Sequence, residues 1–228
     1  MLFIKLKWKS FWLALVVLEI LLVTLYALSV HLNAGVPAAL FDVNGTGTLP
    51  SWLQTIQIFA IGLLPGWLCV TYRDSYRNLR VPPSRYLLAV VSILFLYAAM
   101  DELFKLNILF GAHQLWKWVY LGLGLSIPIV FFRDIVRLCR FAPKTMRLIG
   151  VGVAVFVICG FGLDLFRIHI QQKYWYQLFG QWQFYQVDSI RTALEEFGEM
   201  LGETLILKGM VDLARQRRKQ IALLAQRV

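Results

Sequence analysis

Four glutamates lie close together in the otherwise apolar segment TALEEFGEMLGETLIL, residues 192–207. The four are Glu195, Glu196, Glu199 and Glu203. If the segment is helical, a rotation of about 100° per residue places all four carboxylates within an arc of about 100°. Gly198 and Gly202 form a GxxxG on the adjoining side, which would let another helix pack closely. A row of carboxylates on one helix face can bind a cation or pass protons.

Three further stretches supply charged side chains. In YAAMDELFKLN, Asp101 and Lys105 are spaced for a helical i,i+4 pair, and Glu102 is at the edge of the same face. In GFGLDLFRIH, Asp164 and Arg167 are spaced for an i,i+3 pair. Glu19 stands near the middle of a long apolar run. We therefore expect Lys105 and Arg167 to be supporting ion-pair partners.

Metal binding is the first chemistry that these residues could perform. Carboxylates with histidine suit Mn, Fe or Zn, and carboxylates alone suit Ca or Mg. The candidate ligands are Glu195, Glu196, Glu199, Asp101, Glu102 and Asp164, with His113 and His169 as the nearest histidines. The chain has no Glu-x-x-His motif of the kind that builds di-metal sites in helical bundles. A divalent cation is the candidate cofactor, and its identity stays open.

Proton movement is the second chemistry, and structural pairing is the alternative to both. Glu203 and Glu19 are nearest the middle of their apolar segments, so they are the candidates to change protonation along a proton or cation path. The same acids could instead form ion pairs, within the chain or with a partner, in a non-catalytic subunit of a membrane complex. A metal-dependent membrane enzyme is the third hypothesis.

The composition shows which solvent surrounds these residues. Hydrophobic residues make up 59% of the 228 and charged residues 16%, whereas a soluble domain carries about a quarter charged residues. The apolar residues form runs long enough to cross a hydrocarbon core of about 30 Å. The expected spans are 11–32, 52–71, 86–107, 115–132, 148–168 and 190–210. The predicted fold is an all-α polytopic membrane protein, a single domain over 1–228 with six transmembrane helices in a bundle.

The cations predict the orientation. Eighteen of the 23 Lys and Arg residues fall before the first span, after the second, after the fourth, or in and just before the segment 211–228. The positive-inside rule places that side, both termini and a basic tail over 211–228 in the cytoplasm. The net charge of +10 then indicates contact with anionic lipid headgroups rather than nucleic acid.

Most acids fall on the opposite side from these cations. Nine of the 13 Asp and Glu residues map to the outer half or the outer loops. The nine are Asp42, Asp101, Glu102, Asp164, Asp188, Glu195, Glu196, Glu199 and Glu203. Since the positive-inside rule does not account for acids, we expect an outward-facing polar pocket walled by the third, fifth and sixth spans.

The outer stretch FDVNGTGTLPSW resembles the opening of a calcium loop at Asp42, Asn44, Thr46 and Gly47. Its twelfth position is Leu53, where such a loop needs a bidentate glutamate, so a turn-rich connection is the better interpretation. No cysteine lies in an outer loop, so no disulfide is expected there.

Three stretches together, FDVNGTGTLPSW, MDELFKLN and LEEFGEMLG, are similar to a group of uncharacterised bacterial multi-pass membrane proteins. In that group the Asp-Glu pair is followed by a His-Glu pair, where this chain has Asn107 and Ile108. The resemblance implies no activity, but it implies that Asp101, Glu102 and the glutamates of 195–199 work as one set. It also implies a bacterial inner membrane, with an internal membrane such as the thylakoid as the alternative. A membrane protein partner or a homo-oligomer would suit the structural hypothesis.

Overall fold

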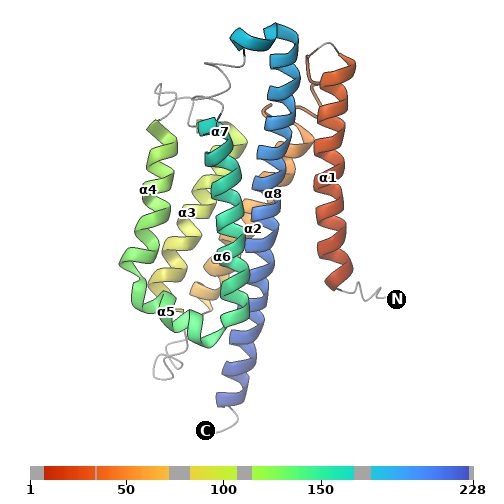
Figure 1. The fold of residues 1–228 in the computed structure, drawn as a ribbon. Coiled ribbons are helices and arrows are strands. Elements are labelled where there is room, and N and C mark those ends of the chain that lie inside the picture. The colour runs from red at the N-terminus through yellow and green to blue at the C-terminus, as the bar shows by residue number, and fades with distance from the viewer. Residues whose placement is uncertain (1–7, 34, 72–82, 107–114, 167–175, 226–228) are drawn as a thin grey trace, which may run out of the picture. The chain divides into compact units, whose positions relative to one another are not determined.

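The computed structural model describes residues 8–33, 35–71, 83–106, 115–166 and 176–225, and every regular element in them is a helix (Figure 1). The helices are α1 (Trp8–Leu32), α2 (Leu49–Val70), α3 (Arg85–Phe104), α4 (Leu115–Val130), α5 (Phe132–Phe141), α6 (Pro143–Val157), the π-helix η3 (Ile158–Gly162), α7 (Leu163–Phe166) and α8 (Tyr176–Ala225). No strand occurs in this part of the chain. The predicted all-α class is therefore confirmed.

Among the described residues, four helical stretches are long and apolar enough to cross a membrane: α1, α2, α3 and the continuous stretch Pro143–Gly162. A fifth is formed if α4 and α5, which are bent by 72° at their break, count as one span. Large apolar side chains on these helices point outward, such as Leu13, Ile93 and Ile129, the last with 75% of its surface exposed. Outward apolar surface of this extent is stable against lipid but not against water. These helices indicate a membrane protein.

The two remaining predicted spans, 115–132 and 190–210, do not coincide with single apolar helices in the structure. The span over 115–132 ends at the bend after α4. The span over 190–210 lies inside α8, which is 50 residues long and is not among the candidate spans because charged residues interrupt its apolar stretch. Residues 211–225 continue α8, and Leu213 and Arg217 are buried there, so this part of the expected tail packs against the protein.

The chain divides into two compact units, with boundaries inside α2, α6 and α8. The first unit consists of Met1–Gln54 and Gly152–Thr204, and the second of Thr55–Val151 and Leu205–Val228. The first therefore contains α1, η3, α7 and the acidic part of α8, whereas the second contains α3, α4, α5 and the basic part of α8.

In the first unit, α8 packs closely against α6 and η3. A Cβ atom on Gly202 would lie 2.8 Å from the carbonyl oxygen of Gly152 and 2.8 Å from Cβ of Phe156, and Gly198 faces the side chain of Cys159. The close approach that the GxxxG spacing predicts is therefore confirmed. A core of Tyr26, Val30, Val43 and Ala193 joins α1, the following loop and α8.

The second unit has its own core, formed by Leu87, Leu138, Ala142 and Leu213. Glycines also bring α2 and α3 together. A Cβ atom on Gly62 would lie 2.9 Å from the backbone nitrogen of Leu96, and one on Gly66 would lie 2.7 Å from the Ser92 hydroxyl.

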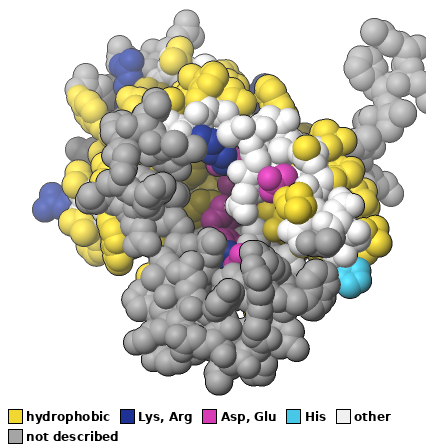
Figure 2. Space-filling view, turned by 90° about the horizontal axis from the view of Figure 1, so that it is seen from above, with side chains coloured by type: hydrophobic (Ala, Val, Ile, Leu, Met, Phe, Trp, Pro, Cys, Tyr) yellow, Lys and Arg dark blue, Asp and Glu magenta, His cyan; other side chains and the backbone are white. Residues whose placement is uncertain are grey.

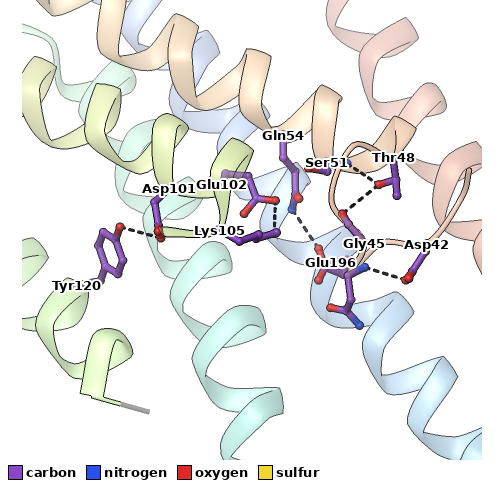
Figure 3. A network of polar contacts seen from close by, with 11 residues as sticks. Asp42, Gly45, Thr48, Ser51, Gln54, Asp101, Glu102, Lys105, Tyr120 and Glu196 are labelled. Carbon is purple, nitrogen blue, oxygen red and sulfur yellow. Dashed lines mark hydrogen bonds and ion pairs between the residues drawn. The ribbon is translucent and has the colours of Figure 1, made fainter. Parts of the chain in front are cut away.

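The connection before α2 consists of turns, as the sequence predicts (Figure 3). The Asn44 amide donates to Oδ1 of Asp42 at 3.1 Å, so the aspartate closes an Asx turn. Thr48 then caps α2, because its hydroxyl accepts a hydrogen bond from the Ser51 amide at 3.3 Å. Ser84 caps α3 in the same way, accepting from the Leu87 amide at 3.2 Å.

Candidate functional site

Asp188 and Glu195, the first of the four glutamates of α8, share one arginine. Arg191 is buried, with 6% of its surface exposed, and its Nε donates to Oδ1 of Asp188 at 3.0 Å. Its Nη1 forms an ion pair with Oε2 of Glu195, and its Nη2 donates to the Thr192 hydroxyl at 2.9 Å. Arg191 is not among the predicted site residues, although its i−3 and i+4 spacing to these acids is the ordinary signal for helical ion pairs. One cation thus offsets part of the negative charge of two carboxylates.

The next acid, Glu196, has a partner on another helix. The side-chain amide of Gln54, near the start of α2, donates to Oε2 of Glu196 at 3.1 Å (Figure 3). Gln54 is buried. A neutral amide satisfies the carboxylate without supplying charge, so Glu195 and Glu196, although adjacent in sequence, lie in different environments.

Glu199 packs against the π-helix η3. Gly160 has no side chain, and a Cβ atom there would collide with Oε1 of Glu199. A π-helical turn inserts one residue into an α-helix and is frequent at functional sites. Here it sets Cys159 against Gly198 and Gly160 against Glu199. The backbone of η3 therefore forms one wall beside this carboxylate.

The C-terminal end of the row of glutamates, at Glu203, is buried together with Glu19 of α1. Glu19, near the middle of the 25-residue α1, has no exposed surface, and the Thr204 hydroxyl of α8 donates to its Oε1 at 2.5 Å. Glu203, the neighbour of Thr204, is 2% exposed. This contact places Glu19 beside α8 at the residue that follows Glu203, and its part in a proton or cation path stays a prediction.

The acids of α3 belong to the second unit and have partners there (Figure 3). The Tyr120 hydroxyl of α4 donates to Oδ2 of the buried Asp101 at 2.9 Å. Lys105 forms its ion pair with Glu102, at 2.6 Å, rather than with Asp101 as the spacing predicts. The reason is local, since α3 ends at Phe104 and Lys105 has a left-handed backbone with φ of 48°, which removes it from the helical i,i+4 position.

Several predicted site residues lie outside what the structure describes. These are Arg167, His113, His169 and the side chain of Asp164. His31 is exposed at the end of α1. Because Asp101 and Glu102 belong to one unit and the α8 glutamates to the other, the recess expected between the three spans stays a prediction.

The acidic residues do not form a metal cluster in the described part of the chain. No group of three or more His, Cys, Asp or Glu side chains there could hold a metal ion. Figure 2 shows acidic side chains reaching one face of the molecule beside Lys or Arg side chains. The observed partners of the acids are an arginine, a glutamine, a threonine, a lysine and a tyrosine.

Comparison with known protein families gives one match. The model of a domain of unknown function (DUF8692) matches residues 12–213. The chain belongs to this family. The matched region of this DUF8692 member contains Glu19, Thr204 and all four glutamates of the row. No curated protein and no solved structure matches the chain.

Proposed function

We propose that this protein transfers protons, or a small cation, through the first unit along the carboxyl groups of α8. The path would start at Glu195 and Glu196, pass Glu199 beside η3, and end at the two buried acids Glu203 and Glu19. Ionisable residues inside membrane helices are rare, face the protein interior and mark such pathways.

The contact between α1 and α8 is the observation that carries this proposal. Glu19 and Glu203 are both buried. Thr204, which follows Glu203 on α8, donates a hydrogen bond from its hydroxyl to Glu19. A hydroxyl group can accept and donate a hydrogen bond at once, so it can stand between two groups that exchange a proton.

Protons suit this arrangement better than a bound metal. Divalent cations need several oxygen ligands that converge on one point. The four glutamates are instead spread over about two turns of α8 and have different partners. A relay needs the opposite, namely a line of groups each within reach of the next.

A flux measurement tests the proposal. Purified protein would be reconstituted into vesicles that contain a pH-sensitive dye, and a potassium diffusion potential would drive proton entry. We expect flux above that of protein-free vesicles, and a loss of about tenfold or more in Glu203→Gln and Glu19→Gln, which keep shape but cannot carry a proton. Asp212→Asn, farther along α8, is the matched control and should leave flux unchanged. Wild-type flux equal to that of empty vesicles, in protein that elutes as a folded species, would contradict the relay.

The second candidate is a non-catalytic subunit whose acids hold the helices in register. The ion pairs of Arg191 with Asp188 and Glu195 favour it, because they satisfy two of the acids within α8 itself. For such a subunit, we expect Glu203→Gln to change neither flux nor ion binding, and to change instead the recovery of a partner or a second copy after detergent extraction.

The proposed topology has six crossings with α8 as the sixth, arranged as a bundle, and both termini in the cytoplasm of a bacterial inner membrane. Cysteine labelling tests the orientation at Arg218, which is exposed in the basic part of α8. In an Arg218→Cys variant that also has Cys69→Ser, Cys139→Ser and Cys159→Ser, we expect a membrane-impermeant maleimide to label inverted vesicles and not intact spheroplasts. Labelling of the spheroplasts would reverse the orientation.

A further inference from the structure

Helix α5 carries its charges on one side. At about 100° per residue, Arg133, Arg137 and Arg140 fall within a strip about 60° wide. All three are exposed. On the opposite side, Leu138 is buried in the core of the second unit and Ile135 packs against it. The helix is therefore fixed to the protein by one face and presents a cationic strip on another.

A third face of α5 is apolar and yet exposed. Phe132 has 64% of its surface exposed, and Cys139, which lies on the same side, is exposed as well. This strip adjoins the arginines and does not join the core. A helix that shows apolar and cationic surface side by side is suited to the boundary between acyl chains and headgroups.

The bend before α5 fits the same location. The axis of α5 departs from that of α4 by 72°, so the two do not continue in one direction. If α5 were the second half of a broken span, its three exposed arginines would lie in hydrocarbon, where charges are costly. Placing α5 along the membrane surface removes this cost.

Neighbouring elements of the second unit add positive charge at this end. Lys144 and Arg147, both exposed, follow in the first turns of α6. Within α5 and the first turns of α6 the acid is Asp134, which lies 3.8 Å from Arg137. The cations therefore exceed the acids on this surface, and the ligand that complements it is an anion.

We propose that α5 lies in the headgroup layer and that Arg133, Arg137, Arg140, Lys144 and Arg147 bind the phosphate groups of anionic phospholipids. Phe132 inserts between the acyl chains beside them. Guanidinium groups suit this role because they can hold a phosphate with two hydrogen bonds. The proposal does not depend on proton transfer by α8.

The test compares two triple variants of the full-length protein in a neutral detergent. R133Q/R137Q/R140Q removes the α5 strip, and R215Q/R218Q/K219Q removes the same number of cations from α8. Binding of phosphatidylglycerol and of phosphatidylcholine would be titrated by native mass spectrometry and by the rise in thermal midpoint. We expect the α5 variant to lose about tenfold or more in affinity for phosphatidylglycerol, and the α8 variant to keep it.

Three outcomes would overturn the proposal. Equal losses in both variants would indicate a general effect of charge, and equal binding of phosphatidylcholine would remove the role of the anion. A midpoint rise of the same size with inorganic phosphate or with an oligonucleotide would assign the surface to a soluble ligand. If the α5 triple variant does not fold, the single substitutions Arg133→Gln and Arg140→Gln replace it, and unchanged affinity in both would also count against the assignment.

Discussion

The hydroxyl group of Thr204 donates a hydrogen bond of 2.5 Å to Oε1 of Glu19, although 185 positions separate the two residues in the chain. Both side chains are buried, and both residues belong to the first unit. This contact joins α1 to α8 at the residue after Glu203, so a change in the protonation of Glu19 alters a hydrogen bond of α8 directly.

Removing the Thr204 hydroxyl should destabilise the protein. In Thr204→Val the shape is kept but Glu19 loses this donor, and we expect the free energy of unfolding to fall by about 1–2 kcal/mol. Chemical denaturation in mixed micelles would measure it. Thr204→Ser keeps the hydroxyl and should retain most of the stability.

Thr24→Val is the matched control for this substitution, because Thr24 is exposed on α1 and its hydroxyl donates to a carbonyl of its own helix. A change as large as that of Thr204→Val would show that the loss reflects the substitution type and not the contact with Glu19.

Replacing Arg191 should have a larger effect. Arg191→Met would leave Asp188 and Glu195 in partly buried positions without their shared cation, and we expect a loss of about 3–5 kcal/mol. The stability of Arg191→Lys should fall between those of the wild type and Arg191→Met, since an ammonium group lacks the forked geometry that reaches both acids. The same denaturation assay applies, with the exposed Arg218→Met as control. A stable Arg191→Met protein would mean that the two acids find water or other partners.

Gly202 should not tolerate a methyl group. Since a Cβ atom there would lie 2.8 Å from a backbone oxygen of α6, Gly202→Ala must push α6 and α8 apart, at a cost of about 1–3 kcal/mol. Gly150→Ala on α6 meets no atom within 4 Å and should be neutral or stabilising by up to about 1 kcal/mol. Thermal midpoints of the two variants would separate these effects, and equal midpoints would contradict the close packing of α6 and α8.

In the second unit, Tyr120→Phe should leave the buried Asp101 without this donor. We expect a loss of about 1–3 kcal/mol. Tyr86 is 78% exposed, so Tyr86→Phe is the control and should change stability by less than about 0.5 kcal/mol. Combining Tyr120→Phe with Asp101→Asn in a double-mutant cycle would measure the coupling energy of the pair, and a coupling of zero would show that the hydrogen bond contributes nothing to stability.

The sequence by itself determined the fold class and the membrane environment, because long apolar runs must avoid water and must satisfy their backbone groups within helices. It also determined that the acids of 195–203 share one face, since helical periodicity depends only on spacing. The ion pairs of Arg191 could have been predicted from the sequence for the same reason.

Only the tertiary structure decided which group each carboxylate meets across helices. Gln54 lies 142 positions from Glu196 and Thr204 lies 185 positions from Glu19, and no local pattern encodes contacts at such separations. The sequence also did not reveal where α3 ends. Lys105 has a left-handed backbone just after the helix, and for this reason it pairs with Glu102 and not with Asp101. Spacing places a charge on a face of its own helix, whereas packing between helices selects the partner.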